Sequence, residues 1–490
     1  MAKTIFNSTE KSNFILNMTE EQYSKLTSRA LVAAMLCVPL FTLVPEISYE
    51  VKGESSYAVS AGGLAVGGVI AIIFAFIAMM KKYIKKSALF PVCAMGAMVI
   101  WGFVSMMNSY DIQISTYGYT ERGEGLLAIL FYFGFFTAAA ALKRETAVKT
   151  VLNGIVGVGL LNSTVALVQV FTGKFSHYYR LSMDEEDVAN AASGLSMSPL
   201  FLAMLLTVAM TAAVIGFAGS DNKKNRIIYL CSAVLFAFVT MFTYSFIGIC
   251  GLAFTVLAAA AAVFKLKAPK IRLLSVPAVA AAALIAFAVV NAGAVGDISS
   301  YKLRDGRILW WADSYMRADA SGDFDADIVD IDNTLDVYLY LNEKTMNIIQ
   351  RFPMTGTGPE QLVFPQLKTD GGLGEEAGIN DIIRLNKGTF DKVYNEYLYT
   401  AATRGIPSLI AMIMVLLPAL FIGRKNSRRR NTSEAFAIAV MALGGVLLYF
   451  IGCSSIAFAP VFWVVAGAAC ADVEEVKAKK NEKKTSSKKK

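Results

Sequence analysis

The sequence predicts an all-α membrane protein, a polytopic bundle of about twelve helices with one large, mainly helical loop insertion. Three observations predict it. Of the 490 residues, 55% are hydrophobic and 17% are charged, and the mean hydropathy is +0.51. Apolar blocks recur along the chain, each about long enough to cross a ~30 Å hydrocarbon layer as a helix. Between Gly296 and Tyr397 this apolar character lapses.

The apolar blocks define the expected spans. They cover residues 29–45, 61–80, 88–107, 126–142, 150–171, 194–218, 227–243, 245–265, 272–295, 398–422, 433–451 and 456–472. The stretch Ile227–Phe264 is about twice the length of a span, so it either turns near Tyr244 or contains a broken helix. The six cysteines lie in or beside these blocks without CxxC spacing. We expect them to be packed side chains, with neither disulfides nor metal.

Lysine and arginine concentrate in alternate connections between the blocks. The clusters are Lys81, Lys82, Lys85 and Lys86; Lys143, Arg144 and Lys149; Lys223, Lys224 and Arg226; Lys265, Lys267, Lys270 and Arg272; and Arg424, Lys425 and Arg428 to Arg430. Because cytoplasmic loops accumulate basic residues, one topology satisfies every cluster. It places both termini in the cytoplasm and the large insertion outside. The net charge of +8 then reflects topology and attraction to membrane lipids, and nucleic acid is not an expected partner.

This topology divides the chain into five parts. They are a cytoplasmic N-terminal segment (1–28), spans one to nine (29–295), the large outer loop (296–397), spans ten to twelve (398–472) and a basic, disordered cytoplasmic tail (473–490). The first segment carries no cleavable-signal pattern, so the first span is expected to act as an uncleaved anchor.

The large loop carries candidate binding residues. Arg304, Arg307 and Trp311 share one face of a predicted helix, where the guanidinium groups could hold phosphate oxygens. The alternative is salt bridges to Asp305 and Asp313.

A second helix is expected over Thr334–Arg351, ended by Pro353. Gly356 and Gly358 then form a glycine-rich turn without the lysine and hydroxyl residue of a P-loop. These glycines are expected to let the backbone turn sharply or approach a ligand.

Polar residues continue into the tenth span. Glu396, Thr400 and Arg404 recur every four residues, so they share a face if this segment is one continuous helix. Arg404 lies past the polar boundary, where an unpaired cation is costly, and is interpreted either as functional or as paired with Glu396. His177, the only histidine, is either a solvated or packed side chain or a base that titrates near neutral pH.

Five short segments occur in an order that one enzyme family shares. They are Ala192–Leu195, Gly306–Trp310, Pro353–Pro359, Tyr394–Leu398 and Arg404–Leu409. The last two resemble the His-Asn-x-x-Leu…Gly-Ile-x-Gly-Leu signature of the O-antigen ligase and polymerase superfamily of bacterial surface-glycan enzymes. The others are similar to its Ser-Gly, Gly-Arg-x-x-Leu-Trp and Pro-x-x-Gly-x-Gly segments. The resemblance covers approximately the second half of the chain.

The resemblance implies a glycosyltransferase-type enzyme of the bacterial cytoplasmic membrane that acts at its outer face. Such enzymes transfer a glycan from a polyprenyl diphosphate carrier to an acceptor hydroxyl, in the synthesis of O-antigen, capsule or exopolysaccharide. The acceptor is another lipid-linked glycan in a polymerase, and a lipid or protein in a ligase. The resemblance implies no metal or other cofactor, because arginines stabilise the departing diphosphate. Other membrane proteins of polysaccharide assembly are further partners.

The resemblance also assigns the site residues. Arg307, together with Arg304, Arg404 or Arg180, is expected to bind the diphosphate, and Tyr394, Asn395 and Glu396 to position the acceptor. The sequence departs from the family in two places. Tyr394 replaces the loop histidine, and a phenol is a poor base at neutral pH; the arginine of a central Ser-Arg-Gly segment is absent from Tyr244–Gly248. These departures indicate an altered acceptor, compensation by His177, Glu396, Arg180 or Arg404, or loss of catalysis.

Two other functions fit the same topology. A transporter or flippase of lipid-linked glycans shares the twelve spans and the cytoplasmic termini, but internal repeats and mid-membrane charges are not evident in the sequence. A catalytically inactive homologue that scaffolds the assembly complex is the third possibility.

Overall fold

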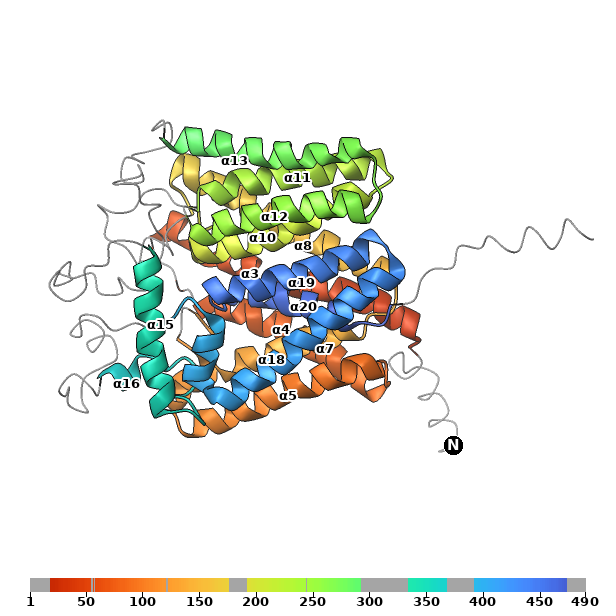
Figure 1. Cartoon of the computed structure of the whole chain (residues 1–490). Helices are drawn as coiled ribbons and strands as arrows, with labels where there is room; N and C mark the ends of the chain where they lie inside the picture. Colours follow the sequence, from red (N-terminus) through yellow and green to blue (C-terminus); the bar gives the residue numbers. More distant parts are fainter. Residues whose placement is uncertain are drawn as a thin grey trace, which may run out of the picture.

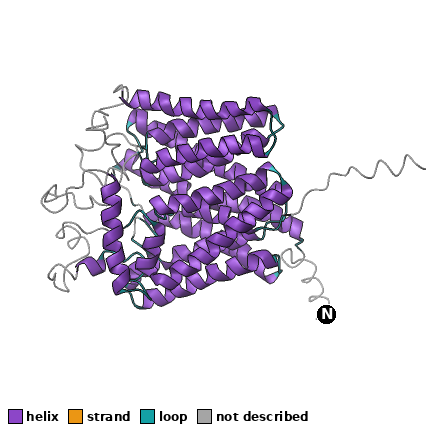
Figure 2. Ribbon diagram, viewed as in Figure 1, coloured by secondary structure: helices purple, strands orange, loops and turns teal. Residues whose placement is uncertain are grey.

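The computed structural model describes residues 18–53, 56, 58–119, 122–175, 192–243, 245–291, 334–367 and 392–473. Within these ranges the regular structure is entirely helical (Figure 2). The all-α class predicted from the sequence is therefore confirmed for the part of the chain that the structure describes.

Within these described ranges, ten helices are long and apolar enough to cross a membrane. They are α3 (Glu20–Lys52), α4 (Ala58–Met80), α5 (Lys86–Met107), α8 (Glu145–Thr172), α10 (Pro199–Gly219), α11 (Lys223–Met241), α12 (Phe246–Lys265), α13 (Ser275–Asn291, entered through the 3-10 turn η1, Lys270–Leu274), α18 (Glu396–Arg430) and α19 (Ser433–Ile451). Two shorter apolar helices are α7 (Leu126–Ala140) and α20 (Ala459–Cys470). Each predicted block overlaps one of these helices, but in the described part of the chain only ten of the helices meet the length of a span.

The long stretch Ile227–Phe264 contains two helices. α11 ends at Met241, and α12 begins after Ser245, whose hydroxyl accepts a hydrogen bond from Gly248 N at 3.0 Å. A serine in this position caps the free N–H groups of a helix start. Of the two alternatives, a turn between two helices is the one observed.

Helix α10 lies at the centre of the bundle, and its apolar segment is 89% buried. It contacts α8, α11, α12 and α19. Small residues permit this: Gly159 of α8 faces Ala209, and Gly251 of α12 faces Thr207. The absence of a side chain lets two helix backbones approach closely, as is common between membrane helices.

The two ends of the bundle differ in composition. Figure 1 shows α15 (Thr334–Arg351) lying across the end of the bundle opposite to the start of α3. The basic clusters occupy the connections at the end where α3 starts, and there Lys85 and Lys143 pair with Glu20 of α3 at 4.0 and 3.2 Å. The predicted bounds of α15 and its termination before Pro353 are confirmed. The short helices α6 (Ile112–Tyr117) and α16 (Phe364–Leu367) lie in connections.

Candidate functional site

Helix α18 is kinked at Gly405, which has φ 78° and ψ 164° inside the helix. Pro407 has no N–H, so it cannot bond the carbonyl of Thr403 four residues earlier. The N–H of Ile406 donates instead to Pro353 O at 2.8 Å. The kink therefore leaves main-chain groups in the interior of α18 that need partners from another segment.

The turn that contains Gly356 and Gly358 supplies these partners. Thr357 N donates to Ala402 O at 3.0 Å, and Gly358 N donates to Thr403 O at 2.9 Å. Both glycines have positive φ, 65° and 106°. A Cβ on Gly356 would overlap the backbone of Thr403. The predicted sharp turn is present, and the backbone that it approaches is that of α18.

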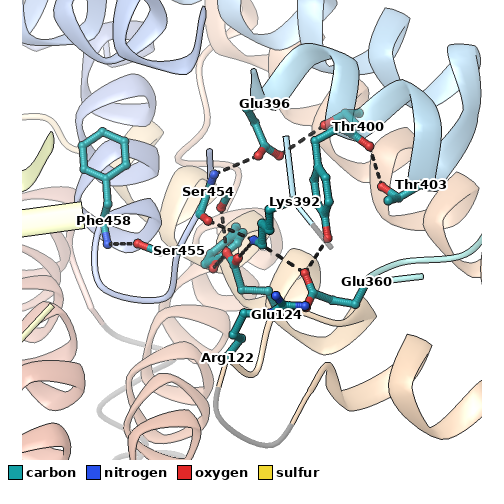
Figure 3. A network of polar contacts seen from close by, with 12 residues as sticks. Arg122, Glu124, Glu360, Lys392, Glu396, Thr400, Thr403, Ser454, Ser455 and Phe458 are labelled. Atoms are coloured by element: carbon teal, nitrogen blue, oxygen red, sulfur yellow. Dashed lines mark hydrogen bonds and ion pairs between the residues drawn. The ribbon is translucent and has the colours of Figure 1, made fainter. Parts of the chain in front are cut away.

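Beside this junction lies a buried cluster of six charged side chains, five of which are labelled in Figure 3. It contains three cations and three carboxylates: Arg122, Lys392 and Arg404, and Glu124, Glu360 and Glu396. They come from the connection before α7, the connection after α15 and the start of α18. We call these six residues the charge cluster. Buried charges of equal number compensate one another, which a low-dielectric interior requires.

Lys392 is the centre of the charge cluster, and its side chain has no exposed area. Its ammonium group donates to a carboxylate oxygen of Glu124 and to Ser454 O, the latter at 3.1 Å. It lies 3.5 Å from Glu360 Oε1 and 4.8 Å from the centre of the Tyr399 ring. Burial lowers the pKa of Lys392, but the two carboxylates outweigh it and raise the pKa well above its usual value.

Glu360 is held by Arg122 on its other side. Arg122 Nε and one terminal nitrogen lie 2.9 and 2.7 Å from Glu360 Oε2, and the Tyr399 hydroxyl donates to Oε1 at 2.6 Å. Burial by itself would raise the pKa of Glu360, but the positive charges of Arg122 and Lys392 together have the larger effect and lower the pKa to about 2. Glu360 is therefore a carboxylate at neutral pH.

Glu396 and Arg404 form the third pair, 3.1 Å apart. Thr400 lies between them and donates to Glu396 Oε1 at 3.2 Å, while Arg404 donates to the Thr400 hydroxyl at 2.5 Å. The expected common face is confirmed, because the kink falls one residue after Arg404. Of the two interpretations of Arg404, the pairing with Glu396 is observed.

Ser454 links the pairs to one another. Its N–H donates to Glu396 Oε2 at 2.8 Å, and its hydroxyl donates to Glu124 Oε1 at 2.8 Å. It belongs to the connection between α19 and α20, so this connection joins α18 to the start of α7 (Figure 3). A network in which each member has a partner fixes one arrangement of its segments.

A cavity of about 30 Å³ lies within the charge cluster. Its walls include Glu124, Glu360, Glu396, Arg404, Tyr132 and Tyr449. This volume is enough for a water molecule, and a sugar does not fit. In this arrangement the charge cluster can position backbone segments and hold a water molecule.

The predicted site residues fall into two groups. Tyr394, Asn395, Glu396, Arg404, Gly356 and Gly358 are described. Asn395 caps α18, Glu396 and Arg404 lie in its first turns, and the turn that contains Gly356 and Gly358 bonds to the same part of α18. Tyr394 is only 2% exposed, and the Asn395 side chain caps α18 by accepting from the N–H groups of Tyr397 and Leu398 at 3.1 and 3.2 Å. His177, Arg180, Arg304 and Arg307 lie outside the described residues.

Sequence reasoning missed Arg122, Glu124, Glu360, Lys392 and Ser454. One signal was present, since Glu124 lies two residues before the apolar block 126–142 and Lys392 six residues before the block 398–422. A charge so close to the end of a span has to be solvated or paired. The partners of these charges could not be identified from spacing.

A separate neutral site surrounds the Ser-Gly segment that precedes α10. The Gln169 amide oxygen accepts from Ser193 N and Gly194 N at 3.1 and 2.7 Å, and the Asn162 amide oxygen accepts from Leu195 N at 2.9 Å. Ala192 N donates to Phe242 O at 2.8 Å. Two amides of α8 thus hold this irregular segment inside the bundle.

No family model matches the chain, and no curated protein is significantly similar to it. Among the described residues, no group of three or more His, Cys, Asp or Glu side chains has an arrangement that could hold a metal ion.

The stabilising contribution of Glu360 is expected to be lost in acid. The pKa of Glu360 is about 2 in the folded chain, whereas the ordinary value of 4.5 applies to the unfolded chain. The unfolded chain therefore binds the proton first as pH falls. The contribution is complete above about pH 4.5 and disappears towards about pH 2. We expect the difference in thermal midpoint between the wild type and Glu360→Gln, measured in detergent, to narrow below about pH 4.5. A difference that stays constant with pH would contradict this account.

Proposed function

We propose that this chain is a membrane glycan polymerase or ligase, which transfers a polyprenyl-diphosphate-linked glycan to an acceptor hydroxyl at the outer face of the cytoplasmic membrane. One observation carries the proposal. The segments Pro353–Pro359, Tyr394–Leu398 and Arg404–Leu409, which resemble family motifs, contact one another at the end of the bundle that bears the insertion. If these segments form one site, they are expected to lie together in the folded chain.

The distribution of charge supports the outward orientation of this end. The basic clusters lie at the opposite end, which the positive-inside rule assigns to the cytoplasm. In this orientation α7 and α20 complete the twelve spans. Their 15 and 12 residues cover about 22 and 18 Å as helices. Both begin at the charge cluster, which is therefore recessed below the outer surface, and irregular backbone at that depth is tolerated where protein covers it.

The geometry suggests a division of roles. Arg404 is buried and paired with Glu396, so we assign it to positioning the start of α18. Diphosphate binding is then assigned to Arg307 and Arg304, with Arg180. Tyr394 and Asn395, at the start of α18, remain the candidates that orient the acceptor, and His177 remains the candidate base.

Deletion of the gene is expected to shorten or abolish the surface glycan, because the glycan would stay on its polyprenyl diphosphate carrier and would not be transferred to the acceptor. The wild-type gene should restore the length distribution seen on gels, whereas Arg307→Ala should not, and Tyr394→Phe should restore it only in part. Arg351→Ala, at an exposed arginine of α15, is the matched control and should restore it fully.

Each other outcome of this experiment points elsewhere. A normal glycan in the deletion strain would argue against an enzyme of glycan assembly. If both site variants restored the glycan fully, the proposed function could still hold, but the assignment of Arg307 and Tyr394 to the site would be contradicted. Accumulation of lipid-linked glycan on the inner leaflet would favour a transporter.

A further inference from the structure

A second cavity, of about 750 Å³, opens at the basic end of the bundle. Segments of α8, α10, α11, α19 and the connection from α12 to η1 surround it. Its walls carry three cations, Lys149, Lys267 and Arg272, and two carboxylates, Asp221 and Glu434. The formal charge of the walls is therefore +1 (three minus two).

Arg272 has hydrogen-bonding capacity that the described residues do not use. It is 8% exposed and donates through one terminal nitrogen to Ala218 O. Its Nε has no hydrogen-bond partner among the described residues. The nearest carboxylate oxygen, on the fully exposed Asp221, lies 3.8 Å from its other terminal nitrogen. Arg272 is one of the residues that line the cavity, so an acceptor that enters the cavity can pair with its guanidinium group.

The starts of two helices add further positive potential. Asn222 caps α11 by accepting from Lys224 N at 2.8 Å, and Thr432 caps α19 by accepting from Ala435 N at 3.4 Å. Both capping residues line the cavity, as does Ser433. The N-terminal end of a helix dipole attracts anions, and its free N–H groups donate to them.

The remaining polar groups of the cavity indicate which anion it fits. The Glu434 carboxylate already has two partners, because Lys149 lies 4.0 Å from it and the Ser433 hydroxyl donates to it at 2.9 Å. The exposed lysines Lys223 and Lys270 follow the lining residues Asn222 and Pro269 in the chain but do not line the cavity themselves. The guanidinium fork and the hydroxyl and amide donors match the oxygens of a phosphate group.

We propose that this cavity binds a phosphate group, carried either by an anionic phospholipid headgroup or by a soluble phosphate. The site lies at the end of the bundle away from the charge cluster, and the proposal does not depend on the function proposed above.

Native mass spectrometry of the full chain in detergent tests the proposal. With phosphatidylglycerol added, we expect bound lipid to be retained, and phosphatidylcholine to be retained much less. The double variant Lys149→Gln/Lys267→Gln should lose about thirtyfold in retention, since each of the two basic groups contributes about 1 kcal/mol near a phosphate. The control Lys223→Gln/Lys270→Gln removes the same charge beside the cavity and should keep wild-type retention. Both double variants should elute as folded protein in size exclusion.

Inorganic phosphate identifies the source of the group. If it displaces the lipid and binds alone with the same dependence on Lys149 and Lys267, the ligand is a soluble phosphate. If it does not compete, the ligand is the lipid headgroup. The proposal is overturned if neither phosphate nor phosphatidylglycerol binds, or if the control variant loses as much retention as the site variant.

Discussion

Replacing Lys392 with methionine is expected to destabilise the folded chain by about 3–5 kcal/mol, the usual cost of removing one partner from a buried ion pair. Methionine keeps a similar apolar stem but leaves Glu124 and Glu360 without the cation that lies between them. Both carboxylates have side-chain exposures of 6% or less, so bulk water cannot solvate them once the ammonium group is gone. The measurement is the free energy of unfolding in detergent micelles.

A second variant distinguishes lost charge compensation from lost packing. Adding Glu124→Gln to Lys392→Met removes the carboxylate that Lys392 contacts most closely, so the double variant should be more stable than the sum of the single effects. Lys86→Met, at an exposed lysine at the start of α5, is the control and should change the free energy by less than about 0.5 kcal/mol. Strict additivity of the two site variants would contradict a compensated charge cluster.

Replacing Gly405 with alanine is expected to cost about 2–4 kcal/mol and to release the turn that follows α15. Two effects add. The residue has φ 78°, where a Cβ is unfavourable, and the new Cβ would overlap Met354 O. The turn would have to move away, and the bonds from Thr357 and Gly358 to α18 would break. Limited proteolysis within 353–363 and the thermal midpoint measure the two consequences.

Gly53 provides the matched control for this substitution. It has φ 74°, nearly the same as Gly405, but a Cβ there would meet nothing within 4 Å. Gly53→Ala therefore reports the conformational cost alone, about 1 kcal/mol. If the two alanine variants were equally stable and equally resistant to protease, the close contact between the turn and α18 would not be important.

Local features of this fold could be predicted from the sequence because local chemistry fixes them. Pro353 ends α15, and Ser245 starts α12. The Glu396–Arg404 pair follows from helical periodicity within eight residues. The number of spans does not follow from the sequence in the same way, because α7 and α20 have 15 and 12 residues and are shorter than the apolar blocks that contain them.

The charge cluster could not be predicted because its contacts are distant in sequence. Arg122 and Glu360 are 238 residues apart, and Lys392 and Glu124 are 268 residues apart. No periodicity relates such positions, and only the packing of the helices brings them together. The kink of α18 was also missed, since Gly405 and Pro407 lie within an apolar run in which membrane helices tolerate both residue types.

The most direct test of the proposed function uses the purified full chain in vesicles that contain a polyprenyl-diphosphate-linked oligosaccharide. The account predicts that longer glycans or glycan-modified acceptors form while free polyprenyl diphosphate is released, and that Arg307→Ala abolishes both while Arg351→Ala does not. If the folded protein released no polyprenyl diphosphate and only moved the lipid-linked glycan between leaflets, the proposal of a transferase would be contradicted.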